Sequence, residues 1–241
     1  MPQRSRRYRA MMEKAGDLSK PLPLGEALAK VKEMAGVRVA RKHAGARKRK
    51  DFDQTVEVVM HLGIDPKQAD QAIRGSVSLP KGIGSTKRVI AFCPADMAAD
   101  AKAAGAVEAG ADDLIAKVSE GWTDFDVAVA HPQLMGKVGK LGRILGPQGK
   151  MPSPKSGTVT PDVLTAVREY SAGKVEYRND EGGNVHAVVG KVSFPVEDLK
   201  ENVEAFISHI RRIKPATAKG QYIKKVAVSA TMTPSVLCEV G

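Results

Sequence analysis

The sequence predicts two domains, a split α+β domain built from residues 1–65 and 161–241 and an inserted α/β domain over residues 66–160. Three observations support this fold class. A chain of 241 residues is long enough to form two small domains. Strands and helices alternate in the middle third, which favours right-handed βαβ units and a parallel sheet. The flanking thirds hold one isolated early strand and a late group of strands, which can complete a sheet if they pair with each other.

The first 65 residues contain two predicted helices, a basic loop and a strand. Residues 4–14 are consistent with one short helix. Apolar residues recur at helical spacing over 24–35, and Gly36 follows as a C-terminal cap. Residues 37–50 are basic and hold almost nothing to bury, so we interpret them as a mobile loop. Residues 55–62 alternate in polarity and are rich in β-branched side chains, which predicts a strand.

The middle third is predicted to alternate between strands and helices. Residues 87–93 form a compact apolar strand, and the alanine-rich stretch 94–104 opens with a proline, as helices often do. Residues 105–118 supply a short strand and a helix, residues 125–130 a buried strand, and residues 132–141 the start of a further helix. This order favours a small parallel sheet covered by helices.

The last third returns to antiparallel character. Residues 161–171 predict a helix that we assign to the split domain. Residues 174–178 and 185–194 flank a glycine-containing turn and predict a hairpin. Residues 195–213 predict a long amphipathic helix, and residues 222–230 predict a final alternating strand.

Positive charge is concentrated in parts of the chain. The sequence carries 38 Lys and Arg against 27 Asp and Glu, and residues 1–50 alone hold 15 basic and 4 acidic residues. Two later stretches, 127–161 and 205–238, contain basic residues and no acid. Segregated positive charge favours a polyanionic partner, with solvated lysine faces as the alternative. Because three such stretches occur, we favour nucleic acid.

The low aromatic content narrows the kind of nucleic acid. Phe, Trp and Tyr make up only 4% of the chain. Proteins that bind single strands commonly stack bases on aromatic side chains. A basic chain with few aromatic residues is therefore expected to hold the backbone and shape of folded, double-helical RNA, with a DNA-architectural protein as the alternative.

The sequence shows no feature typical of an enzyme, a membrane protein or a secreted protein. No P-loop, GxSxG elbow, HExxH helix or metal-ligand spacing occurs, so we predict no catalytic residue, no metal and no cofactor. Gly82 and Gly84 precede a strand, which favours a turn over the dinucleotide site of a nucleotide-using enzyme. No apolar run reaches membrane-spanning length and the N-terminus lacks the apolar core of a secretory signal. The two cysteines, Cys93 and Cys238, fit a cytosolic protein.

The densest motif is the basic, Gly/Pro-rich stretch 141–159. Its lysines and arginine are suited to line a groove for a nucleic-acid backbone, and its glycines would let phosphate approach closely. A stiff connection between domains explains the same composition. Both interpretations stay open at the level of sequence.

Two further segments carry candidate contact residues. In residues 52–58, Phe52 stands before a strand from which Thr55 and Glu57 project on one face. A carboxylate facing RNA is unfavourable unless it accepts from a ribose 2′-hydroxyl or a guanine edge, and an ordinary solvated strand face is the alternative. Residues 230–235 end the last strand with hydroxyl groups and a methionine, which could meet ribose or simply form a turn.

Taken together, several segments resemble the bacterial L-one family of large-subunit ribosomal proteins. The similarity is carried by residues 6–14, 52–58, 62–65, 74–82, 120–135, 140–159, 176–180, 189–194 and 231–235. The resemblance implies a split RNA-binding domain with an inserted Rossmann-like, three-layer α/β domain. It also implies a cytoplasmic, ribosome-associated protein that binds the stalk region of large-subunit rRNA near the tRNA exit site. Further implied roles are the movement and release of deacylated exit-site tRNA and repression of translation by binding the mRNA of its own operon.

Carried over by motif, the resemblance assigns rRNA contacts to two segments: Phe52, Thr55 and Glu57, then Thr231, Met232 and Thr233. Auxiliary contacts are expected from six basic residues: Lys140, Arg143, Lys150, Lys155, Lys224 and Lys225. The family usually has glycine at the position of Thr233, so a side chain there could crowd the RNA backbone. The basic stretch 38–50 is longer than typical, and we hypothesise that it adds phosphate contacts.

Overall fold

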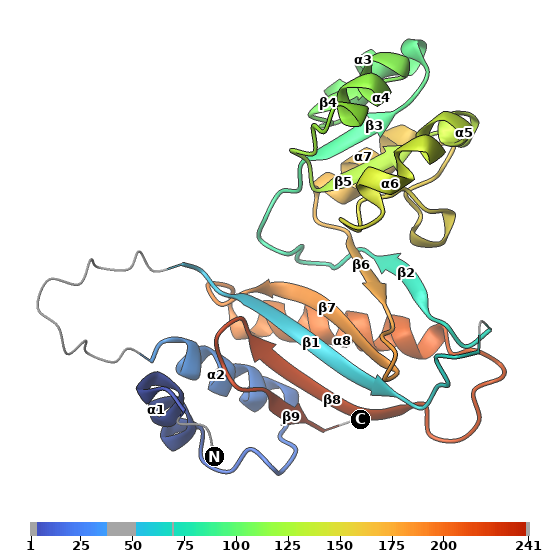
Figure 1. The fold of residues 1–241 in the computed structure, drawn as a ribbon. Coiled ribbons are helices and arrows are strands. Elements are labelled where there is room, and N and C mark those ends of the chain that lie inside the picture. The colour runs from blue at the N-terminus through green and yellow to red at the C-terminus, as the bar shows by residue number, and fades with distance from the viewer. Residues whose placement is uncertain (1–3, 38–51, 69, 240–241) are drawn as a thin grey trace, which may run out of the picture. The chain divides into compact units, whose positions relative to one another are not determined.

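The computed structural model describes residues 4–37, 52–68 and 70–239 (Figure 1). The basic stretch 38–50, with its predicted phosphate contacts, lies outside the described residues. The chain forms two compact units, which comprise residues 1–73, 79–84 and 178–241 (the terminal unit) and residues 74–78 and 85–177 (the inserted unit). This division differs from the boundaries predicted near residues 65 and 160.

The terminal unit is built on a four-stranded antiparallel sheet in the order β7-β1-β8-β9 (Figure 1). The strands are β1 (Thr55–Leu62), β7 (Asn184–Lys191), β8 (Ile223–Ala230) and β9 (Val236–Cys238). Strand β1 pairs with β7 on one side and β8 on the other, which confirms that the early strand completes a sheet with the C-terminal part. The sequence does not predict β9, because three residues are too few to show an alternating pattern.

Helices cover one face of this sheet. They are α1 (Arg6–Ala15), α2 (Leu24–Ala35) and α8 (Val196–Arg212). Every second residue of β1 is buried, and Leu199, Phe206 and Ile210 of α8 are fully buried. Helices α2 and α8 pack side by side on the buried face, and α1 packs on α2. Helix α8 approaches so closely that a Cβ on Gly190 would lie 2.8 Å from Cδ2 of Leu199.

The other face of the sheet, which we call the open face, carries none of the described helices of this unit (Figure 1). Directly paired residues of neighbouring strands project on the same side. The register therefore places four rows on the open face: Thr55–Lys191, Glu57–Val188–Ser229, Val59–His186–Ala227–Leu237 and His61–Asn184–Lys225. The face is mixed in character, with an apolar middle and polar ends.

A buried asparagine organises the edge of the sheet next to α8. The register between β1 and β7 shifts at Val189, and Nδ2 of Asn202 donates to the carbonyl of this extra residue at 2.8 Å. The same amide group donates to the carbonyl of Gly82 (2.9 Å), while its oxygen accepts from the N–H of Lys81 (3.0 Å). Gly82 and Gly84 both have positive φ. The interpretation of this glycine pair as a turn is confirmed.

The predicted hairpin over 174–194 is wrong. Strand β6 (Val175–Arg178) pairs with β2 (Arg74–Val77) in a separate two-stranded sheet, and β7 pairs with β1. Only an isolated bridge between Asn179 and Val185 joins the two predicted arms. Strand β1 offers β7 an eight-residue partner with a fully buried face, which outweighs the short local pairing.

The inserted unit contains a parallel sheet in the order β4-β3-β5 (Figure 1). Its strands are β3 (Val89–Phe92), β4 (Glu108–Gly110) and β5 (Val127–Ala130), and its longer helices are α3 (Ala95–Ala103), α4 (Asp112–Ser119) and α7 (Val163–Ser171). All residues of β3 and β5 are buried. Separate apolar clusters lie on the two faces of the sheet. The predicted three-layer α/β architecture is therefore confirmed.

Helix α7 belongs to the inserted unit, so its predicted place in the split domain is wrong. Val167 and Tyr170 of α7 are fully buried in the same apolar cluster as Val89 and Val129 of the parallel sheet. The apolar stripe of a helix does not reveal which sheet it covers, because either sheet can bury it equally well.

The helix predicted from residue 132 is divided into short pieces. They are η1 (Pro132–Leu134), α5 (Met135–Val138), η2 (Gly139–Leu141) and α6 (Gly142–Leu145), followed later by η3 (Pro154–Ser156). Three glycines, at 136, 139 and 142, weaken helix propagation and favour tighter single turns.

Candidate nucleic-acid interface

Two segments that are far apart in the sequence join at one end of the open face. The N–H of Thr231 donates to the carbonyl of Thr55 at 3.0 Å, and the N–H of Thr55 donates to Oγ1 of Thr231 at 3.0 Å. The two residues are 176 positions apart. The candidate segments 52–57 and 231–233 therefore lie side by side, and we call them together the junction.

Two large apolar side chains are exposed at the junction. Phe52 is 57% exposed and Met232 is 45% exposed. Among the described residues, Val107 is the only other large apolar side chain with comparable exposure. Both side chains project from the adjoining segments of the junction, and a partner that covers them would remove apolar area from water.

Thr55 and Glu57 supply the polar groups of the junction. Both are half-buried on the open face, as the alternation of β1 predicts. Oγ1 of Thr55 accepts a hydrogen bond from Nζ of Lys191 at 2.9 Å. Because this hydroxyl already accepts from a lysine, its own proton is free to be donated to a ligand oxygen. The ionised carboxylate of Glu57 can only accept.

Lys191 is a functional candidate that the sequence pattern misses. It follows the glycine of a family-like motif, but a lysine in a strand normally reads as a solvated residue. The pairing of Lys191 with Thr55 places its ammonium group beside the junction. The signal could have been found only by knowing that β7 pairs with β1 in this register.

Thr233 turns back toward its own strand. Its Oγ1 accepts from the N–H of Ala230 at 2.8 Å and lies 3.3 Å from the carbonyl of Ala230, while its N–H donates to that carbonyl at 3.0 Å. The side chain is half-buried. This orientation argues against the expected crowding of an RNA backbone.

Lys224 and Lys225 lie at the other end of β8. Lys225 pairs with His61 and Ile223 pairs with Leu62, so Lys224 is an extra residue in the strand. This bulge leaves two consecutive lysines exposed. Thr231 lies six residue steps beyond Lys225 along the strand, which corresponds to about 20 Å. They are therefore outside the junction.

The remaining basic candidates lie in the inserted unit. Lys140, Arg143 and Lys155 are exposed. Lys150 is half-buried, and its Nζ donates to the carbonyl of Thr123 at 2.9 Å and lies over the ring of Phe125 at 5.2 Å. Lys150 therefore has a structural role that explains its presence.

The C-terminal half of the Gly/Pro-rich motif forms a hydrogen-bonded cluster with Tyr170 of α7, which we call the cage and define by Ser153, Ser156, Thr158 and Tyr170. Oγ1 of Thr158 accepts from the N–H of Ser153 at 2.8 Å, and the hydroxyl of Tyr170 donates to the carbonyl of Ser156 at 2.6 Å. Ser156 and Thr158 are almost completely buried. This part of the motif supports the structural interpretation, while Arg143 and Lys155 keep exposed positive groups.

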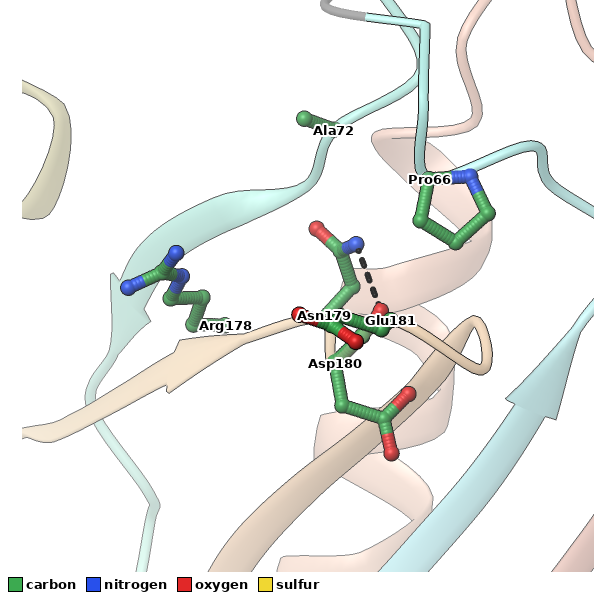
Figure 2. Close-up of a pocket in the computed structure, with 6 residues that line it drawn as sticks. All are labelled: Pro66, Ala72, Arg178, Asn179, Asp180 and Glu181. Atoms are coloured by element: carbon green, nitrogen blue, oxygen red, sulfur yellow. Dashed lines mark hydrogen bonds between the residues drawn. The ribbon is translucent and has the colours of Figure 1, made fainter.

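A shallow hollow of about 470 Å³ lies beside the turn after β6 (Figure 2). Its lining residues are Pro66, Ala72, Arg178, Asn179, Asp180 and Glu181. The polar side chains serve the turn: Asn179 accepts from the N–H of Ile73 (2.7 Å), and Asp180 accepts from the N–H of Asn184 (2.7 Å). Hydrogen bonds from Asn184 lower the pKa of Asp180. With both charge signs at its rim, the hollow offers no selective ligand site.

Within the described part of the chain, no group of three or more His, Cys, Asp or Glu is placed to hold a metal ion. Nor does any described helix have the length and apolar character needed to cross a membrane.

Comparison with known proteins identifies the family. A sequence model of the ribosomal protein L1p/L10e family matches residues 40–234. The chain belongs to this family. It is 48% identical over 234 residues to the large ribosomal subunit protein uL1 of a Nocardioides strain, with 97% of this chain and 92% of the relative covered. The protein of the same name from Nitratidesulfovibrio vulgaris is 49% identical over 234 residues (97% and 94% covered). That from Clavibacter sepedonicus is 49% identical over 238 residues (99% and 98% covered).

Family membership confirms the resemblance on which the contact residues rest. The chain is a ribosomal protein of the large subunit, which is a ribosome-associated, cytoplasmic and structural component and not an enzyme. The alternative of a nucleotide-using enzyme, which the sequence already disfavours, therefore has no support.

Proposed function

We propose that the chain binds the stalk region of large-subunit rRNA near the tRNA exit site, with the junction as its primary contact. The main observation behind this proposal is the pair of hydrogen bonds between Thr55 and Thr231. These bonds join the segments that bear the exposed side chains of Phe52 and Met232. Because protein hydrogen bonds already fix these groups, little side-chain or loop ordering is needed on binding.

The groups of the junction suit a ribose. The Thr55 hydroxyl donates, and the Glu57 carboxylate accepts from a 2′-hydroxyl or a guanine edge. Lys191 offsets the repulsion between that carboxylate and nearby phosphates. The ring of Phe52 and the thioether side chain of Met232 pack against a sugar or a base. Since DNA lacks the 2′-hydroxyl, RNA is the favoured ligand.

Other proposed contacts are electrostatic. Exposed Lys140, Arg143, Lys155, Lys224 and Lys225 add attraction to phosphates without reading sequence. Lys150 contributes less, because its ammonium group is held by Thr123 and Phe125. Thr233 acts by closing the turn that presents Met232.

Two finer roles follow from the same binding surface. A protein bound to the rRNA stalk beside the exit site would assist the movement and release of deacylated tRNA. An mRNA of its own operon that folds like the stalk RNA would occupy the junction and be repressed in translation. Both roles are implied by the resemblance to the L-one family. A junction that recognises ribose and RNA shape would allow one surface to accept two RNAs.

The test compares binding of the full chain to a stalk rRNA fragment and to duplex DNA of the same length at equal salt. We expect RNA to bind tighter by on the order of 1,000-fold, the usual margin of specific over non-specific binding. Chemical footprinting should show protected riboses on the fragment. Equal affinity for DNA, or a fragment with no protected nucleotide, would overturn the proposal.

A further inference from the structure

The main-chain position of Met232 is set by a side chain from the other segment of the junction. The N–H of Met232 donates to Oε1 of Gln54 at 3.1 Å, across 178 positions of sequence. Gln54 lies between Phe52 and Thr55 in the sequence, but it is only 6% exposed. Its side chain therefore packs inside the protein beneath the exposed groups of the junction and does not face a ligand.

Both polar atoms of the Gln54 side-chain amide make hydrogen bonds. Nε2 donates to the carbonyl of Ala35, the last residue of α2, at 3.2 Å. The amide orientation is fixed by chemistry, because the N–H of Met232 can only donate and the carbonyl of Ala35 can only accept. The carbonyl of Gln54 also accepts from the N–H of Val192 at 2.9 Å. One residue thus ties the end of α2, the exit from β7 and the Met232 turn together.

The two side-chain bonds of Gln54 differ in how replaceable they are. The carbonyl of Ala35 has a second donor, Nη2 of Arg7, at 3.4 Å. The hydrogen bond to Oε1 of Gln54 is the one that holds the N–H of Met232. Loss of the acceptor would therefore free the Met232 main chain, whereas loss of the donor would leave Ala35 partnered.

We infer that Gln54 is a positioning residue of the RNA interface, which acts through Met232 by holding its N–H and so fixing the direction of its side chain. This inference rests on the proposed function of the junction. It extends that proposal, because Gln54 is buried and would make no contact with RNA.

The test is a double-mutant cycle with Gln54→Met and Met232→Ala, measured as the affinity of the full chain for the stalk rRNA fragment. Methionine keeps the length of the side chain but removes the acceptor. In the background with Met232, Gln54→Met should weaken binding by about tenfold, as expected when one partly buried hydrogen bond is lost. In the Met232→Ala background the same change should have little further effect, because the side chain that it positions is gone.

A matched control is available in the same unit. Gln71 is 8% exposed, and its Oε1 accepts from the N–H of Asp65 at 2.8 Å, away from the junction. Gln71→Met should leave RNA affinity unchanged. Amide hydrogen exchange gives an independent readout: the Met232 N–H should lose protection in Gln54→Met and keep it in Gln71→Met.

The outcomes separate the two proposals. If Met232→Ala leaves RNA affinity unchanged, the proposed function of the junction fails. If Met232→Ala weakens binding but Gln54→Met does not, or weakens it equally in both backgrounds, the junction stands and the inference about Gln54 is overturned.

Discussion

In both the junction and the cage, a threonine hydroxyl accepts a hydrogen bond from a main-chain N–H, but the two threonines differ in exposure. At the junction, Thr231 exchanges hydrogen bonds with Thr55 and stays exposed. In the cage, Thr158 accepts from the N–H of Ser153 and is 2% exposed. Both lie in segments that identify the family. The difference teaches that a characteristic motif marks either a ligand surface or a folding element, and that burial of its polar groups separates the two.

The comparison has a physical basis. A buried hydroxyl that lacks a partner costs about 1–3 kcal/mol, so the polar groups of the cage are fixed by the needs of folding. The exposed groups of the junction have water as an alternative partner and are free to exchange it for RNA. Substitutions in the cage should therefore affect stability, and those in the junction should affect binding.

The largest effect is expected from Tyr170→Ala in the cage. Removal of a fully buried aromatic ring should lower the free energy of unfolding by about 3–5 kcal/mol. Chemical denaturation measures this change. RNA affinity, measured at a temperature where the variant is folded, should match that of the natural chain. A loss of affinity in the folded variant would break the distinction between cage and junction.

Met232→Ala should produce the opposite pattern. Loss of its contact with RNA should weaken binding by about 1–3 kcal/mol, while the free energy of unfolding should change by less than about 0.5 kcal/mol, because the side chain is largely exposed. Titration of the stalk rRNA fragment measures the first quantity. Val107→Ala is the matched control, since Val107 is an exposed apolar residue of the inserted unit. It should bind RNA normally.

Alkaline pH should weaken the cage through Tyr170. Burial raises the pKa of Tyr170 from 10.0 to about 12. The unfolded chain therefore loses this proton at lower pH than the folded chain, so the stabilising contribution is complete below pH 10 and declines as the pH rises to about 12. Over this range the free energy of unfolding of the natural chain should fall relative to that of Tyr170→Phe, which has no hydroxyl to ionise. A constant difference would contradict the burial of this hydroxyl.

Thr233→Gly sharpens the comparison within the junction itself. The change removes the hydroxyl that accepts from the N–H of Ala230 and adds backbone freedom, so stability should fall by about 1 kcal/mol. RNA affinity should fall slightly, because the turn that presents Met232 is less ordered. An increase in affinity would instead support crowding by the threonine side chain.

The smallest effect is expected from Lys224→Gln. Lys224 is exposed on a bulge outside the junction, so stability and RNA footprint should be unchanged. If it contacts a phosphate, the slope of log affinity against log salt should decrease in magnitude by about one. An unchanged slope would remove Lys224 from the proposed auxiliary contacts.

Much of the fold is readable from local patterns. The alternation in β1 and the apolar stripe of α8 predict those elements, because each has one face in water and one in the core. The sequence predicts the wrong partners for β6 and α7, because the local pattern of a short strand or an amphipathic helix does not specify which sheet it joins. For the site, the segments around Thr55 and Thr231 were recognised from motifs, whereas Lys191 and Gln54 were missed.

The order of residues by itself determined most of the helices and strands, the concentration of positive charge and the family of this protein. The tertiary structure alone decided which polar groups are buried and which face outward. Hydrogen bonds such as that between Gln54 and Met232 join residues 178 positions apart, and they depend on strand register and close packing. No local periodicity encodes such a contact, since its energy exists only after distant segments have been brought together.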